Sequence, residues 1–192
     1  FSSSMVYGNF KGKKVKENIL CKPIGIYGNL KLAGEMMLKS YSHVFKFPYT
    51  IVRPSALYGE RCVSRRVSQM FIENALEGKE IIINGDGSEK LDFTYIEDLL
   101  QGVQKIIKTK KSHYQTFNIT FGNGRKIIDL VKLLKLKFPS LRIKFIPWDK
   151  LTPKRGGLSI NKAKNLLKYR PSFNIEVGYK KYINWYKNFY SS

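Results

Sequence analysis

The sequence predicts an α/β fold with a doubly wound parallel sheet, and three observations indicate it. Apolar residues recur at helical spacing between residues 27 and 41. This helix leads into the continuous apolar run of residues 49–53, which is typical of a parallel strand covered on both faces. A helix followed by a buried strand is the repeating order of doubly wound sheets. The 192 residues, 43% of them hydrophobic, can bury a core of one domain or one and a half.

The first 60 residues are expected to form the ligand-binding end of this sheet. Residues 1–4 are predicted to end a buried strand, and residues 4–22 to form a lysine-rich loop over the site. Pro54, Ser55 and Ala56 directly follow the strand of residues 49–53. Open α/β sheets bind ligands at the carboxyl ends of their strands. These three residues are therefore candidates for ligand contact, and a plain strand-ending turn is the alternative.

Beyond Gly59 the sequence predicts further helices and short strands. A helical stripe from Val67 to Ala75 ends at Gly78, a residue suited to a left-handed helix cap. Helices are also predicted near residues 99–107, 127–136 and 175–189, and extended segments at 81–83, 91–95 and 143–146. Gly85-Asp86-Gly87 and Gly122-Asn123-Gly124 are predicted turns, and Trp185, Tyr186 and Phe189 are predicted packing residues.

The formal net charge of +21 raises the question of nucleic-acid or anionic-membrane binding. The lysines are spread along nearly every segment, with short clusters at residues 11–16 and 108–111. The chain has no arginine-rich arm and no nucleic-acid motif. The charge is therefore interpreted as a bias of composition, and no specific nucleic-acid partner is predicted.

The remaining composition limits the class of protein. Two cysteines, Cys21 and Cys62, cannot build a disulfide framework, which favours the reducing cytoplasm. His43 and His113 lack ligand-like neighbours, so no metal site is predicted. No apolar run approaches the roughly 20 residues of a membrane span, so no membrane partner is predicted.

Ser3, Tyr27 and Lys31 are the candidate catalytic residues. A tyrosine and a lysine four positions apart share one face of a helix. A free phenol has a pKa of about 10, so ionising it at pH 7 costs about 4 kcal/mol, which a nearby ammonium and an oxidised nicotinamide could offset. A serine hydroxyl can hold the reacting oxygen by a hydrogen bond. Such a set moves a proton to or from an alcohol while a cofactor takes the hydride.

A second tyrosine–lysine pair has the same spacing. Tyr7 and Lys11 are also four positions apart, but no apolar stripe follows them, whereas one follows Tyr27. The Tyr27 pair is therefore placed on a helix and the Tyr7 pair in a loop. Residues of an ordinary core edge are the alternative interpretation of the Tyr27 pair.

Five motifs in order carry a resemblance to a known family. They are Ser3 with Val6-Tyr7-Gly8, Tyr27-Gly28 with Lys31, Arg53 to Gly59, Gly85-Asp86-Gly87 ahead of Asp92-Phe93, and Arg155-Gly156-Gly157. Together they resemble the extended short-chain dehydrogenase/reductase family, the NAD-dependent nucleotide-sugar epimerases and dehydratases such as UDP-glucose 4-epimerase. The resemblance implies a Rossmann-like fold with a smaller α/β substrate-binding lobe. It implies NAD rather than NADP as cofactor, a nucleotide-diphosphate sugar as substrate, and a homodimer through the Tyr27 helix.

The resemblance also assigns roles to residues. Tyr27 would be the general base, Lys31 would hold the nicotinamide ribose, and alignment on Val6-Tyr7-Gly8 selects Ser3 to hold the sugar. Pro54 and Ala56 would contact the cofactor, Ser55 the substrate, and Arg155 the substrate diphosphate. The family often has a second arginine directly before the aspartate of its Asp-Phe motif. Leu91 stands there in this chain, with Lys90 or Arg61 as possible substitutes.

The serine motif helps to choose the reaction. Dehydratases of this family resemble one another in having acidic residues in the two positions before Val6-Tyr7-Gly8. Those positions are Ser4 and Met5 here, and neither is a general acid near pH 7. The expected reaction is therefore epimerisation by oxidation and re-reduction at C4, as part of carbohydrate metabolism and polysaccharide biosynthesis. A dehydratase, a sugar dehydrogenase or ketoreductase, and a non-catalytic nucleotide- or polyanion-binding module are the alternatives.

The glycine-rich turn that binds the cofactor pyrophosphate in this family is not found before Ser3, and the chain opens at Phe1. The chain is therefore expected to be the C-terminal portion of a longer enzyme, inactive alone and without NAD binding of its own. Residues 1–60 would complete the NAD-binding domain and carry the catalytic residues. Residues 61–192 would form mainly the nucleotide-sugar-binding lobe, with some segments returning to the first domain.

Overall fold

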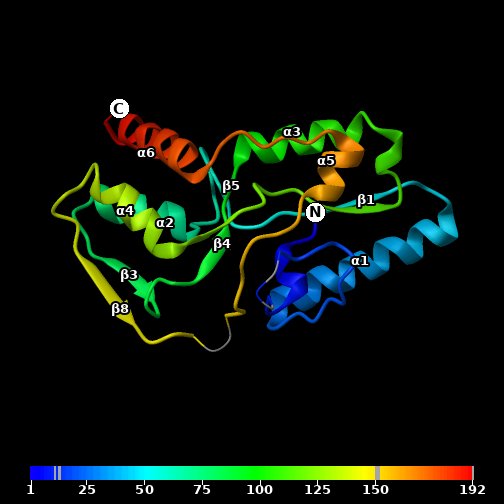
Figure 1. Ribbon diagram of the computed structural model, residues 1–192, viewed down its shortest axis with the longest axis horizontal. Helices are drawn as coiled ribbons and strands as arrows, with labels where there is room; N and C mark the ends of the chain where they lie inside the picture. Colours follow the sequence, from blue (N-terminus) through cyan, green and yellow to red (C-terminus); the bar gives the residue numbers. More distant parts are fainter. Residues whose placement is uncertain (11, 13, 150–151, 192) are drawn as a thin grey trace.

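The computed structural model describes residues 1–10, 12, 14–149 and 152–191, and these residues form an α/β fold (Figure 1). The helices are α1 (Ile26–Phe45), α2 (Val67–Leu76), α3 (Ile96–Ile107), α4 (Ile127–Lys135), α5 (Asn161–Leu167) and α6 (Ile175–Ser191), with the 3-10 helices η1 (Ser4–Tyr7) and η2 (Lys110–Ser112). The strands are β1 (Thr50–Arg53), β2 (Leu57–Tyr58), β3 (Ile81–Asn84), β4 (Lys90–Asp92), β5 (Thr94–Tyr95), β6 (Gln115–Asn118), β7 (Gly124–Lys126) and β8 (Ile143–Ile146).

Parallel pairing dominates the strands. The predicted strand of residues 49–53 is β1, and it pairs in parallel with β6, with Val52 opposite Phe117. The β2–β5 and β3–β8 pairs are also parallel, whereas β4 and β7 are antiparallel. Side chains on successive residues of β1 point to opposite faces.

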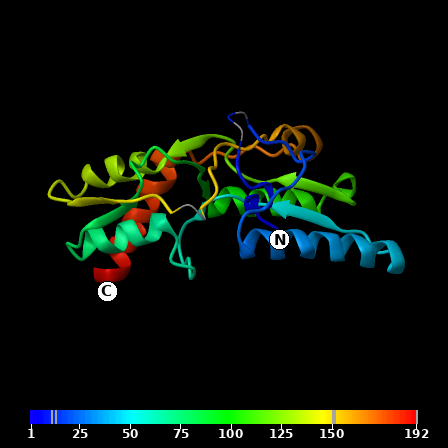
Figure 2. The same ribbon diagram turned by 90° about the horizontal axis from the view of Figure 1, so that it is seen from below.

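Helices cover both faces of the β1–β6 pair, which is the doubly wound arrangement predicted from the sequence. On one face Val52 packs in a buried cluster with Leu99 of α3 and Leu167 of α5. On the other face Arg53 forms a buried ion pair with Glu35 of α1, at 2.6 Å. Figure 2 shows α1 and α5 on opposite sides of these strands. Although α3, β6 and α5 come after residue 60, they pack with β1.

A second apolar cluster lies among α2, α4 and α6, away from β1 (Figure 1). It contains Phe71, Leu130 and the fully buried tyrosines Tyr179 and Tyr182. The strands β3 and β8 lie beside these helices, and Ile81 and Ile83 direct their side chains into the cluster. The predicted helical stripe from Val67 to Ala75 is α2, and Phe71 and Ala75 are buried as predicted. Met70 of the stripe is 40% exposed, however, and α2 also buries Ser68, Gln69 and Ile72.

The buried carboxylate of Asp92 fastens three segments together. One of its oxygens accepts hydrogen bonds from the backbone N–H groups of Gly122 and Asn123, at 3.0 and 3.4 Å. The other accepts from the Leu158 N–H at 2.8 Å and the Thr120 hydroxyl at 3.1 Å. Burial raises the pKa of Asp92 to about 6, although all of these hydrogen bonds lower it. Through these hydrogen bonds the carboxylate ties β4 to the turn after β6 and to residue 158.

The N-terminal segment departs from the expected strand and loop. Residues 1–3 form no assigned strand, yet the Ser2 N–H donates to the Val52 carbonyl at 2.8 Å and the Ser4 N–H to the Pro54 carbonyl at 2.9 Å. The expected loop begins instead with the 3-10 helix η1, because the Ser3 hydroxyl accepts from the Met5 N–H at 3.2 Å and caps it. The segment therefore lies beside β1, on the side opposite β6.

Helix α1 is longer than predicted, and its apolar stripe is not buried in the described part of the chain. Leu30, Met37 and Tyr41 are 66%, 60% and 55% exposed. The residues that α1 buries are Gly28, Glu35 and Ser42. The stripe correctly indicated a helix, but the face packed against β1 is small and polar.

Three simple findings concern metals, membranes and thiols. Among the described residues, no three His, Cys, Asp or Glu side chains gather in a way that could hold a metal ion. No helix of the described chain is long and apolar enough to cross a bilayer. Cys21 and Cys62 are both free thiols.

Candidate active site

A cavity of about 250 Å³ lies beyond the carboxyl end of β1 and brings together most of the predicted site residues. The predicted residues that line it are Ser3, Tyr27, Pro54, Ser55, Ala56 and Arg155. They come from the cap of η1, the start of α1, the segment after β1 and the loop before α5. Larger cavities occur elsewhere, but this one is lined by most of the residues that the sequence indicates as catalytic or ligand-binding.

Tyr27 and Lys31 lie as an i, i+4 pair on α1. The Lys31 ammonium nitrogen is 5.7 Å from the centroid of the Tyr27 ring. Tyr27 is 48% exposed and faces the cavity, so a ligand can reach its phenol. Lys31 lines an adjoining cavity with Phe1 and Glu35, and its ammonium donates to the Phe1 carbonyl at 3.2 Å. The pair thus spans two neighbouring cavities at the start of α1.

Close approach of two backbone segments brings Ser3 to the same cavity as Tyr27. A Cβ atom on Gly28 would lie 2.7 Å from the Met5 carbonyl oxygen and 3.0 Å from the Pro23 side chain. Only a glycine therefore allows α1 to pack this closely on η1. Ser3 itself is 8% exposed and caps η1. The glycine after Tyr27 in the motif thus sets how near the serine and the phenol can be.

The structure separates the two tyrosine–lysine pairs. Tyr7 is 2% exposed, and its hydroxyl donates to Asn118 at 2.7 Å and accepts from Arg53 at 3.0 Å. Burial raises the pKa of Tyr7 far above its ordinary value, despite the charge of Arg53. Lys11 lies outside the described residues. Tyr7 is therefore a structural residue that cannot exchange a proton with a ligand, and it lies in η1 rather than in a loop.

Arg155 reaches the cavity with part of its guanidinium unpaired. One terminal nitrogen forms an ion pair with Glu89 at 3.2 Å. Its buried Nε atom has no hydrogen-bond partner. A buried donor without a partner is costly, so the group is suited to an incoming acceptor such as a phosphate oxygen. Burial also raises the pKa of Glu89, although the charge of Arg155 opposes this.

Arg66 is a cavity residue that sequence reasoning missed. It caps the start of α2 and lines the cavity together with Arg155 and Leu91. The two substitutes expected for the missing arginine lie elsewhere: Lys90 lines another cavity, and Arg61 lines neither. The Arg66 guanidinium donates to the Ser64 hydroxyl at 3.0 Å. No motif marks this position, because it enters the site only through the packing of α2.

No carboxylate lines this cavity within the described chain. The positions before Val6 that could hold an acid are Ser4 and Met5, and both side chains belong to the lining. The cavity is therefore basic, with Arg66 and Arg155 as its charged residues. It offers hydroxyl groups, a phenol and two guanidinium groups, which suit an alcohol that carries an anionic group.

The sequence of the chain is similar to a known protein family and to individual members of it. Residues 1–120 match the model of the NAD dependent epimerase/dehydratase family. The chain is 31% identical to a Bacillus subtilis protein named as an uncharacterized UDP-glucose epimerase, covering 98% of this chain and 60% of that protein.

Solved structures of two epimerases are similar to this chain in sequence and in fold. The chain is 32% identical, with a TM-score of 0.93, to UDP-glucuronic acid 4-epimerase from Bacillus cereus in complex with UDP-glucuronic acid and NAD, covering 98% and 60% of the two chains. It is 28% identical, with a TM-score of 0.91, to UDP-glucose 4-epimerase from Thermotoga maritima with UDP-glucose, covering 98% and 62%. The chain thus spans about three fifths of the length of these relatives.

Proposed function

Because this chain belongs to the NAD dependent epimerase/dehydratase family, we propose that it is the C-terminal part of an enzyme that epimerises a nucleotide-diphosphate sugar at C4. The observation that carries the proposal is the single cavity lined by Ser3, Tyr27 and Arg155. A hydroxyl can hold the sugar, a phenol can move its proton, and a guanidinium can bind a diphosphate. Two relatives were solved with UDP-sugars, which supports this substrate class.

In this proposal the chain provides the proton chemistry. Tyr27 accepts the proton of the C4 hydroxyl and later returns it, while Ser3 holds the same oxygen by a hydrogen bond. The Lys31 ammonium lies beside the Tyr27 ring, one helical turn along α1. NAD, when bound, would supply the hydride acceptor and donor for C4. Tyr27, Pro54 and Ala56 would hold NAD, because they line the cavity beyond the carboxyl end of a parallel strand, where such sheets bind nucleotides. Lys31 would hold NAD from the adjoining cavity, one helical turn after Tyr27.

The lining favours epimerisation over dehydration. Elimination of water from the sugar needs an acid to protonate the leaving hydroxyl. Ser4 and Met5 occupy the positions from which family dehydratases supply that acid, and no carboxylate lines the described cavity. Return of the hydride to either face of a 4-keto sugar needs no further group from the chain. The site residues therefore suffice for an epimerase.

The proposal predicts the product of the full-length enzyme. Incubated with UDP-glucose or UDP-glucuronic acid and NAD, it should form the C4 epimer with no net consumption of NAD. Proton NMR of the sugar ring follows the reaction, because the C4 configuration changes the coupling to its neighbours. A 4-keto-6-deoxy product, or NADH formed in proportion to product, would contradict epimerisation and indicate a dehydratase or a dehydrogenase.

Arg66 is proposed to bind the substrate diphosphate together with Arg155. Arg66→Gln should weaken binding of UDP-glucose roughly fivefold, about 1 kcal/mol, since it removes one charge-assisted contact. We expect KM to rise with little change in kcat, because this contact is equally present in the ground state and the transition state. Titration calorimetry and steady-state kinetics measure both quantities.

Arg65→Gln is the matched control for this prediction. Arg65 precedes Arg66 directly, but it pairs with Glu73 at 3.2 Å and does not line the cavity. The control removes the same charge from the same segment and should leave binding nearly unchanged. An equal loss of UDP-glucose affinity in the two variants would show a general charge effect and contradict the assignment of Arg66.

The exposed stripe of α1 is proposed as the surface of a homodimer. Leu30, Met37, Tyr41 and Phe45 are each more than half exposed on one helix. A contiguous apolar surface of this kind is typical of a protein interface. The family resemblance names the same helix, so the two arguments agree on its role.

A further inference from the structure

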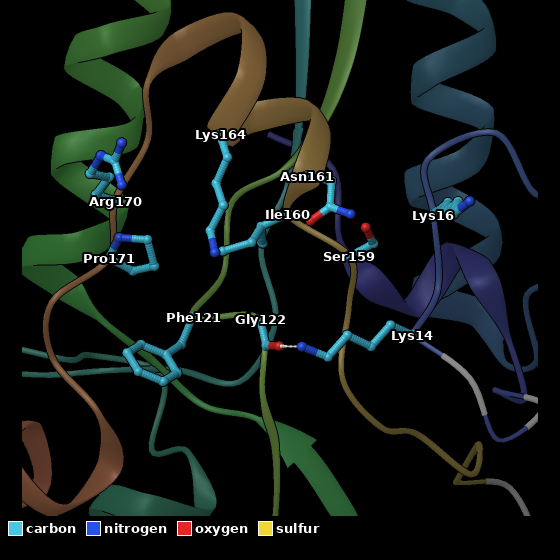
Figure 3. A pocket seen from close by; sticks show the side chains of 10 residues that line it. All are labelled: Lys14, Lys16, Phe121, Gly122, Ser159, Ile160, Asn161, Lys164, Arg170 and Pro171. Carbon is cyan, nitrogen blue, oxygen red and sulfur yellow. Dashed lines mark hydrogen bonds between the residues drawn. The ribbon is translucent and has the colours of Figure 1, made fainter.

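A second cavity, of about 540 Å³, shares no lining residue with the candidate active site. It is built from residues 14–16, the turn at 121–122, residues 159–164 and residues 170–171 (Figure 3). Cavities of this size commonly bind small molecules. None of the roles assigned above to the chain uses these residues.

The charge of this second cavity is not neutralised. Lys14, Lys16, Lys164 and Arg170 line it, and no carboxylate does. Three other cavities of the described chain place Glu17, Glu35 or Glu89 beside their lysines. Cations that face one cavity repel one another, and an anion would relieve this repulsion. The candidate active site also combines cations with no carboxylate among the described residues.

The side chains are arranged so that two amines face the same space. Lys14 donates a hydrogen bond to the Gly122 carbonyl, which fixes its ammonium at the base of the cavity. Figure 3 shows Lys164 extending into the space above Phe121 and Gly122, with Arg170 at the rim beside Pro171. Lys16 points away from this space. An ammonium has three donors, so Lys14 keeps donors for a ligand while bound to the backbone.

The cavity also has an apolar side. Phe121 and Pro171 are partly exposed there, next to the buried Ile160. The Phe121 ring offers a flat surface on which a planar base can stack. Cations beside a flat apolar surface suit a ligand that joins phosphate groups to an aromatic base. We propose that this cavity binds a nucleoside phosphate, with the phosphates at Lys14, Lys164 and Arg170 and the base against Phe121.

The test locates binding by NMR and compares two ligands. The ¹⁵N-labelled chain is titrated with ADP and with inorganic pyrophosphate, and the amide signals of Phe121, Gly122 and Asn161 are followed. We expect saturable shifts with both, and a lower Kd for ADP, because only ADP carries a base. Lys164→Gln/Arg170→Gln should raise the Kd for ADP roughly tenfold through the loss of two charged contacts. Neither substituted side chain has a partner among the described residues, so the fold should be retained.

Two control variants separate this site from general charge effects and from the candidate active site. Lys144→Gln/Lys180→Gln also removes two exposed positive charges, but neither residue lines a cavity described above. This pair and Arg155→Gln should leave the Kd measured at Phe121 unchanged. Equal weakening in the control pair, or no saturable shift at millimolar ADP, would overturn the site. Equal Kd values for pyrophosphate and ADP would overturn the assignment of a nucleoside.

Discussion

Tyr27→Phe in the full-length enzyme is expected to lower kcat roughly 10³-fold while leaving nucleotide-sugar binding nearly unchanged. General acid–base groups contribute about 10²–10⁴ to enzymatic rates, and this substitution removes only the phenol oxygen. The ring that lies under the Lys31 ammonium, at 5.7 Å, is retained. Packing should survive, because Tyr27 is 48% exposed at the start of α1. Stopped assays of epimer formation and calorimetric titration with UDP-glucose measure the two quantities.

Tyr41→Phe is the matched control on the same helix. Tyr41 is 55% exposed and stacks on Phe45, and it lies outside the cavity. Loss of its hydroxyl should change neither kcat nor binding. If Tyr27→Phe retained most of its activity, or if Tyr41→Phe lost as much, Tyr27 would not be the base. The proposed epimerase mechanism would then fail at its proton-transfer step.

Local patterns in the sequence were sufficient to find most helices and several strands. The strand predicted at residues 143–146 is β8, and the helices near 99–107 and 127–136 are α3 and α4. These segments show an apolar period of their own. Gly85 and Gly87 have φ values of 72° and 76°, a conformation that glycine adopts easily, and they form the predicted turn.

Elements that form only through long-range pairing could not be predicted from the sequence. β6 mixes polar and apolar residues, and it is a strand because it pairs with β1, more than 60 residues earlier. β2 has only two residues and is a strand because it pairs with β5, which lies in the predicted extended segment of residues 91–95. α5 has seven residues, too few for a helical period to stand out from its surroundings. Such elements depend on tertiary contacts, which one sequence does not reveal.

The same distinction holds for the candidate site. Ser3, Tyr27 and the residues after β1 lie in short motifs, and the structure places them around one cavity. Arg66 joins them only because the fold brings the start of α2 to the same cavity as the segment after β1, so no local pattern indicated it. The exposure of the apolar stripe on α1 could also not be predicted from the sequence. Its spacing shows a helix but does not say which face β1 covers.

Arg53→Met is expected to destabilise the chain by about 3–5 kcal/mol, because it leaves the buried Glu35 carboxylate without its partner. Arg53 and Glu35 are 4% and 3% exposed, and two parallel hydrogen bonds of 2.8 and 2.6 Å join them. Burial alone would raise the pKa of Glu35, but the hydrogen bonds and the charge of Arg53, with smaller contributions from Ser2 and Lys39, together outweigh burial and hold the pKa below its ordinary value. Urea unfolding followed by circular dichroism measures the change. Lys79→Met is the control, because it breaks an exposed ion pair with Glu77 and should cost at most about 1 kcal/mol.

The pH dependence and a double variant identify the cause of this loss. A carboxyl whose pKa is lowered by folding stabilises the protein above its ordinary pKa, and this contribution is lost as the pH falls through the folded-state pKa. In Arg53→Met the unpaired Glu35 can take up a proton, so the cost of the substitution should be smaller at pH 4 than at pH 7. Glu35→Leu/Arg53→Met should recover part of the stability, but not all, because Arg53 also donates to the Tyr7 hydroxyl and the Glu17 carbonyl. A double variant no more stable than Arg53→Met would show that these other contacts, and not the stranded carboxylate, account for the loss.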